Sequence, residues 1–255
     1  MRFLPALILA GAIAPIYSAQ AYQVNLNFSN LSGGNGAALS PIFIALQDGG
    51  FNPYTPGSAA SPAIVQLAET GSGAGLAGEF NQSGGLSVEV TAMGGFGPGI
   101  YLPGQTGGIS LNLDPVANRY LSFFSMVVPS NDRFVGGKIE LFDAAGNFLG
   151  ANSTLSGNAI WDAGAVASQL AGAAFLVNNA GGNTPTPGGV ISLNDNFAVY
   201  AGQLTPAGYN FSNLPGDATP LLNISAVAAV PLPAAAWLFG GALPLLGGIG
   251  RRKAV

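Results

Sequence analysis

The chain has 255 residues, including 39 glycines and 18 prolines, and it contains neither histidine nor cysteine. These absences exclude a Ser-His-Asp triad, a cysteine nucleophile, a thiolate zinc site and any disulfide. Between residues 22 and 229, eleven acidic residues stand against three basic ones, a net charge of −8. This balance is the opposite of the basic surface that nucleic acid requires, so we expect no nucleic-acid partner. A divalent cation is a more plausible partner for this negative charge.

The N-terminal 21 residues are typical of a secretory signal peptide. One positive charge, Arg2, precedes an apolar run from Phe3 to Ile16. Prolines break this run, which argues against a permanent N-terminal membrane anchor. The small residues Ala19 and Ala21 flank Gln20 as a predicted cleavage site, so we expect the mature chain to begin at residue 22.

The body from residue 22 to 229 is predicted to be a single domain of about eight β-strands. Several segments alternate apolar and polar residues, as a strand with one buried face does. Others are more apolar or less regular, as expected for strands that are buried on both faces or lie near an edge. Glycine-rich, proline-rich and asparagine-rich connections favour an antiparallel β-sandwich. The predicted strands are Val24–Phe28, Ile42–Leu46, Leu86–Val90, Ile109–Leu113, Leu121–Val128, Lys138–Phe142, Phe197–Ala201 and Leu222–Ser225.

One short helix is predicted after Ser61, a favourable N-cap followed by proline at the first helical position, and it ends before Gly71. The alanine-rich segment 162–174 is a second helix candidate, which Gly164 and Gly172 weaken. Residues 73–78 match the dinucleotide-binding pattern G-x-G-x-x-G. They follow no strand and lie in no βαβ unit, so we interpret them as a flexible connection.

The C-terminal segment has the pattern of a membrane-spanning helix. From Ala234 to Gly250, 17 residues carry no charge, close to the minimum for crossing a hydrocarbon core of about 30 Å. Three basic residues follow at once and would stay in the cytoplasm by the positive-inside rule: Arg251, Arg252 and Lys253. The body would then be held outside.

This C-terminal segment resembles the PEP-CTERM sorting signals of Gram-negative bacteria, in the variant with the motif Val-Pro-Leu-Pro-Ala. Here the motif is Val230, Pro231, Leu232, Pro233 and Ala234. The resemblance implies export through the inner membrane, transient membrane retention and cleavage near the motif by an exosortase. The segment 230–255 is therefore expected to be a removable sorting device.

The body resembles the spondin N-terminal domain family. The similar pieces follow that family's order: Ser40-Pro41-Ile42-Phe43-Ile44-Ala45, Gly57–Ser61 with Leu67–Gly71, Ser125–Gly136, and Trp161-Asp162-Ala163-Gly164. The resemblance implies an antiparallel sandwich related to C2 domains. It also implies calcium at one end of the sandwich and a role in adhesion or in matrix or carbohydrate binding.

Two positions match the family's calcium ligands, Asp132 and Asp162, whereas Val166 falls where a further acid is expected. Calcium prefers six to eight oxygen ligands, so two carboxylates predict weak binding. Asp195 is a candidate for completing the shell. The alternative is that Asp132 caps a turn through its own backbone. Glu89 and Glu140 lie on the polar sides of predicted strands and are expected to be solvated.

The sequence therefore predicts an exported, non-enzymatic binding or adhesion module of the cell surface or extracellular matrix, with a polysaccharide or a surface protein as its ligand. Calcium is its only expected cofactor. One alternative is an ion-free structural component of the polysaccharide matrix. Another is a glycan-acting enzyme, since two carboxylates suffice for that chemistry, although no spacing singles out a pair.

Overall fold

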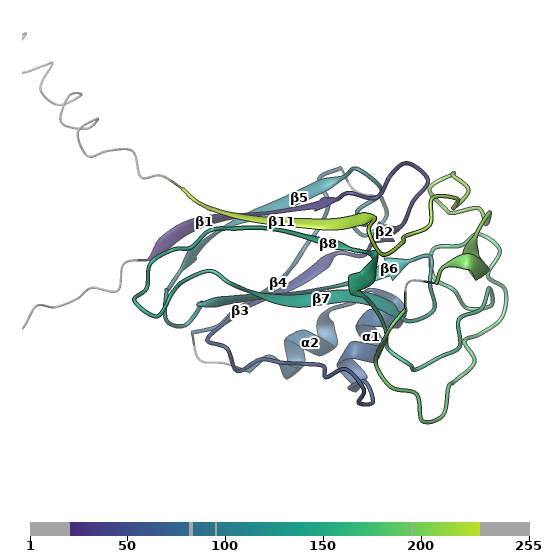
Figure 1. Cartoon of the computed structure of the whole chain (residues 1–255), viewed down its shortest axis with the longest axis horizontal. Helices are drawn as coiled ribbons and strands as arrows, with labels where there is room; N and C mark the ends of the chain where they lie inside the picture. The colour runs from purple at the N-terminus through teal and green to yellow at the C-terminus, as the bar shows by residue number, and fades with distance from the viewer. Residues whose placement is uncertain (1–20, 82–83, 95, 195, 230–255) are drawn as a thin grey trace, which may run out of the picture.

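The computed structural model describes residues 21–81, 84–94, 96–194 and 196–229. Within them the chain forms two antiparallel β-sheets and two α-helices, which confirms the predicted β-sandwich in its general form (Figure 1). The predicted signal peptide up to residue 20, the sorting segment 230–255 and Asp195 lie outside the described residues. No helix in the described part of the chain is long and apolar enough to span a membrane.

The first sheet has four strands. Its order is β5 (Thr106–Leu113), β1 (Tyr22–Asn30), β11 (Pro220–Ala228) and β8 (Ala151–Ser156). The chain's first and last described strands are thus neighbours, with Val24 opposite Ala228.

The second sheet has seven strands, all paired antiparallel to their neighbours. Its order is β10 (Ser192–Leu193), β9 (Ile160–Asp162), β7 (Arg133–Glu140), β6 (Tyr120–Val128), β3 (Ile42–Gln47) and β4 (Leu86–Val90). The short β2 (Ala38–Leu39) pairs with the end of β6.

Strand β3 shows why some strands are apolar throughout. Ile42, Ile44 and Leu46 pack into the core between the two sheets, whereas Phe43 and Ala45 pack beneath the helices on the other face. Successive side chains of a strand point to opposite faces, so a sheet that is covered on both faces needs apolar residues at every position. The prediction that such strands are buried on both sides is confirmed for β3 and β6.

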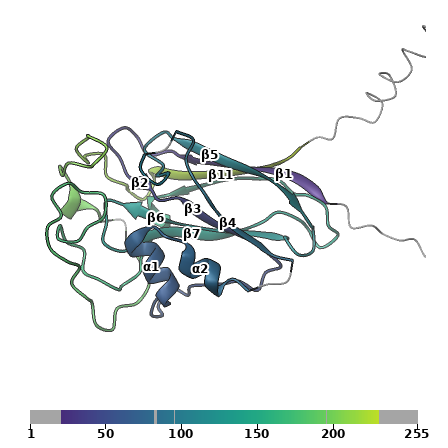
Figure 2. The same ribbon diagram turned by 180° about the vertical axis from the view of Figure 1, so that it is seen from behind.

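Helix α1 (Pro62–Thr70) covers the outer face of the seven-stranded sheet (Figures 1 and 2). The Ser61 hydroxyl accepts a hydrogen bond from the Ile64 N–H, at 3.3 Å, and so caps the helix. At its end Gly71 takes a left-handed conformation with φ of 73°. Both predicted ends of this helix are confirmed.

The predicted flexible connection at residues 73–78 is wrong, because these residues overlap a second helix, α2 (Ala74–Glu79). Leu76 is fully buried against the sheet. A Cβ atom at Gly75 would lie 2.9 Å from the Ala63 Cα, so glycine here allows the two helices to approach closely. Glycine at position 75 thus allows α2 to pack closely against α1, which the G-x-G-x-x-G spacing alone did not indicate.

Two further predictions are wrong. Residues 197–201 contain a 3-10 helix, η2 (Ala198–Tyr200), in place of a strand. In the segment 162–174, Asp162 ends β9 and the rest forms bends, turns and isolated β-bridges in place of a helix. Gly164 has φ of 69°, and a Cβ there would lie 2.6 Å from the Val190 backbone, so tertiary packing overrides the helical propensity of the alanines.

The two ends of the sandwich differ. The described chain enters at Tyr22 and leaves at Ala229 at one end, where the Ala229 N–H bonds the Gln23 carbonyl. At the opposite end lie the β6–β7 turn and most of the irregular segment 163–219 (Figure 1). We call this opposite end the loop-covered end.

Candidate functional site at the loop-covered end

The turn that joins β6 to β7, together with the first residue of β7, carries four consecutive buried polar side chains. These residues, Ser130 to Arg133, are each at most 1% exposed, and we call them the polar turn. Buried polar groups must find hydrogen-bond partners inside the protein. The partners here come mostly from the irregular segment 163–219, so the turn and the loops hold each other in place.

The Asn131 side chain of the polar turn makes four hydrogen bonds to the loop segment. Its amide Nδ2 donates to the Ala171 carbonyl at 3.0 Å and to the Asn183 Oδ1 at 2.9 Å. Its Oδ1 accepts from the Gln169 N–H at 2.9 Å and from the Tyr200 hydroxyl at 2.7 Å. One side chain therefore connects four points of the loop segment to the end of β6.

Arg133 is buried among aromatic rings. Its guanidinium carbon lies 4.4 Å from the centre of the Phe197 ring and 5.7 Å from that of Tyr200. Its Nη2 also donates to the Ser168 hydroxyl at 3.1 Å. Such a cation–π contact is stronger when it is shielded from water, so Arg133 holds η2 against the turn.

Asp132 is fully buried, and its two carboxylate oxygens differ. Oδ2 accepts from the N–H groups of Ala165 and Val166, at 2.8 and 3.0 Å. Oδ1 has no hydrogen-bond partner among the described residues. Burial, and next the repulsion from Asp162, raise the pKa of Asp132 to about 6. The site thus contains one buried oxygen that a proton or a cation would satisfy.

Asp162 lies next to Asp132, at the end of β9. Its Oδ1 accepts from the Gly164 N–H at 2.8 Å, and its Oδ2 from the Asn194 Nδ2 at 3.0 Å. The neighbouring Ala163 N–H bonds the Asp132 carbonyl at 3.0 Å. The structure therefore brings the two predicted acids together, although 29 residues separate them in sequence.

The alternative that Asp132 caps a turn through its own backbone is wrong, because its side chain binds the 165–166 backbone on another loop. Val166, the position without the expected acid, does lie at the site and supplies an N–H donor instead of a carboxylate. No group of three or more acids that could hold a metal occurs within the described ranges. The site therefore offers a cation one free carboxylate oxygen, with a second acid nearby.

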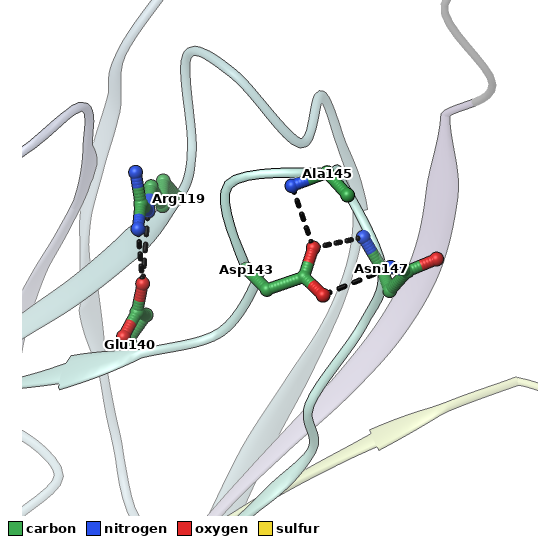
Figure 3. A network of polar contacts seen from close by, with 5 residues as sticks. All are labelled: Arg119, Glu140, Asp143, Ala145 and Asn147. Carbon is green, nitrogen blue, oxygen red and sulfur yellow. Dashed lines mark hydrogen bonds and ion pairs between the residues drawn. The ribbon is translucent and has the colours of Figure 1, made fainter.

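The other acids discussed above lie elsewhere. Glu89 is exposed and accepts a hydrogen bond from the Gly73 N–H at the start of α2. At the other end of the sandwich Glu140 forms an ion pair with Arg119 at 2.6 Å (Figure 3). Beside it Asp143 accepts hydrogen bonds from Ala145 and Asn147, and the Asn147 side-chain bond is the main cause that lowers its pKa.

The roles of Asn131 and Arg133 could not be predicted from the sequence. Both flank Asp132, which the sequence singled out as a metal ligand. The only sequence feature that could have indicated their burial is the run of polar residues after an apolar strand. Comparison with models of protein families and with curated proteins gives no match to this chain. The resemblance to the spondin N-terminal domain and to the sorting signals remains a prediction from the motifs.

The raised pKa of Asp132 makes stability depend on pH. The folded state keeps the Asp132 proton up to about pH 6, whereas the unfolded state releases it near pH 3.8. The free energy of unfolding should therefore fall by about 2–3 kcal/mol as the pH rises from about 4 to about 6 in calcium-free buffer, and change no further above that. Urea denaturation across this range measures it.

The matched variant is Asp132→Asn, whose amide cannot ionise but is of similar size. The difference in free energy of unfolding between wild type and variant should change with pH by this amount, and the variant should be the more stable protein at pH 8. A difference that stays constant between pH 4 and 8 would contradict the pKa assignment.

Proposed function

We propose that the chain is an exported, non-enzymatic binding module of the bacterial cell surface, which recognises a polysaccharide or a surface protein with its loop-covered end. The observation that carries this proposal is the arrangement of the two ends. Residue 229 leaves the sandwich at the end opposite the loops (Figure 1). A tether that follows it would hold the loop-covered end away from the membrane, where ligands are accessible.

The predicted processing signals support this orientation. A signal peptide cleaved after Ala21 would release the N-terminus outside the inner membrane. The segment 230–255 would hold the protein in that membrane until an exosortase cleaves near the Val230–Ala234 motif. After cleavage the module would belong to the cell surface or to the extracellular matrix.

Family membership is part of the same proposal. The motifs that resemble the spondin N-terminal domain are distributed over β3, α1, β6 and β9. The last two of these elements lead to Asp132 and Asp162, which lie together. The meeting of two of the four motif segments at one end of the sandwich supports a C2-like domain with its ligand site there.

Calcium is proposed to assist binding at this site. Asp132 and Asp162 would hold the ion, with Asp132 Oδ1 as the free carboxylate oxygen. The ion would supply positive charge between two acids that repel each other and would thereby fix the 163–166 loop. The observation that favours an ion-free structural protein instead is that backbone and amide donors already occupy the other oxygens of both acids.

Millimolar calcium should raise the melting temperature at pH 8, because an ion that binds only the folded state stabilises it by mass action. Asp132→Asn should abolish the shift. The matched control is Asp143→Asn, which lies beyond the opposite end of β7 from the polar turn and should leave the shift intact. Differential scanning fluorimetry with calcium or magnesium measures this. Equal melting temperatures with and without calcium in the wild type would favour the ion-free alternative.

Sorting is tested on the protein isolated from its native host. Mass spectrometry of the mature chain should find it outside the cytoplasm, without Arg251–Lys253 and ending near Val230–Ala234. Replacing Pro231 and Pro233 by alanine should preserve the tail, whereas the control Pro206→Ala in a body loop should be processed normally. A mature wild-type protein that keeps residues 251–253 would overturn the sorting proposal.

A further inference from the structure

The outer face of the four-stranded sheet carries an array of uncharged amides and hydroxyls. The inward side chains of these strands, such as Val24, Leu26 and Ile224, are buried in the core. The strand register places the alternate residues side by side on the outer face. Six of them are Asn25, Asn27, Ser110, Asn152, Asn223 and Ser225. We call this surface the amide–hydroxyl face.

This face contains no charge. None of the four strands includes Asp, Glu, Lys or Arg, although the body has a net charge of −8. The strands of the other sheet, in contrast, include Glu89, Lys138 and Glu140. Both α-helices cover that other sheet, so they leave the amide–hydroxyl face open (Figures 1 and 2).

Hydrogen bonds between strands orient part of the array. The Ser110 hydroxyl donates to the Asn25 Oδ1 at 2.5 Å. The Asn223 Nδ2 donates to the Asn152 Oδ1 at 2.9 Å and to the Thr154 hydroxyl at 3.0 Å. An amide offers two donor hydrogens and two lone pairs, so these side chains keep hydrogen-bonding capacity for a ligand while their orientation is already fixed.

We propose that the amide–hydroxyl face binds a neutral polysaccharide laid across its strands. Sugar hydroxyls donate and accept hydrogen bonds, as the amides and hydroxyls of this face do. The rows of side chains repeat about every 4.8 Å across the sheet, giving a strip about 14 Å wide for a polymer of repeating hydroxyls. An acidic polysaccharide would find no cation on the face and would be repelled by the negative body.

A second copy of the chain fits this face less well. Interfaces between identical subunits have an apolar core, and the outer face offers mainly amides and hydroxyls, with Val227 as an exposed apolar residue. The inference rests on the proposed function and extends it, because it names the class of ligand and adds a second binding surface. It does not use the calcium site.

Affinity electrophoresis of the purified protein through gels that contain dextran, galactomannan or mixed-linkage β-glucan tests the proposal, with alginate as the acidic comparison. At least one neutral polymer should retard the protein. The retardation should be the same at low and high salt and with EDTA. Retardation by alginate alone, or by none of the polymers, would overturn the inference.

The decisive variant is Asn25→Asp with Asn152→Asp. Each aspartate keeps the acceptor oxygen and the side-chain volume, but the pair puts two charges on the face. We expect at least tenfold weaker binding to the neutral polymer. The control, Gln66→Glu with Asn81→Asp, adds the same charge at exposed sites in α1 and after α2 and should bind as the wild type does.

Equal binding by wild type and by the face variant would place the polysaccharide elsewhere on the module and overturn the inference. Sedimentation velocity provides a second measurement. A wild-type dimer that the face variant dissociates would assign this face to self-association instead. The proposed function is tested separately, by the mass of the mature chain from the native host. A failure of that proposal can therefore be distinguished from a failure of this inference.

Discussion

The buried amide of Asn131 is the interaction on which the irregular part of the structure depends. The described residues of the segment 163–219 contain no strand or helix besides the two-residue β10 and the short η2, so their polar backbone finds few partners within regular structure. Asn131 connects residues 169, 171, 183 and 200 of this segment to the end of β6. Arg133 and Asp132, its neighbours in the polar turn, bind further points of the same segment. The loop-covered end is thus built around one turn.

The residues that stabilise the sandwich are therefore different from those proposed to bind ligands. Apolar side chains buried between the two sheets, and between the seven-stranded sheet and the helices, stabilise the sandwich. The seven-stranded sheet therefore needs apolar residues on both of its faces. The four-stranded sheet is covered on one face only, which leaves its outer face free to carry amides and hydroxyls. Polar groups at the loop-covered end must instead satisfy each other, and Asp132 Oδ1 is an exception there among the described residues. The proposed ligand surfaces are therefore the outer sheet face and the end opposite residue 229.

Alternation and apolar runs in the sequence predicted most of the long strands, because the core imposes a period of two on strands that it covers. The caps predicted α1 correctly. Strand β8 was missed because its Asn-Ser-Thr run has few apolar residues, and α2 was missed because its glycines fit against α1 only in three dimensions. For the site, the motifs predicted that Asp132 and Asp162 belong together. They could not predict that Val166 donates to Asp132 or that Asn131 holds the loops, since both depend on contacts distant in sequence.

Hydrogen exchange of Asn131→Ala tests most directly whether the polar turn holds the loop segment. The substitution removes the four hydrogen bonds of a buried amide and should lower the free energy of unfolding by about 3–5 kcal/mol. The backbone N–H of Gln169, which bonds Asn131, should lose its protection, while amides of β3 exchange only as fast as global unfolding allows. The control Asn118→Ala also removes a buried amide, at the other end of the sandwich, and should leave the loop segment protected. Equal protection of Gln169 in wild type and Asn131→Ala, relative to global stability, would contradict the account.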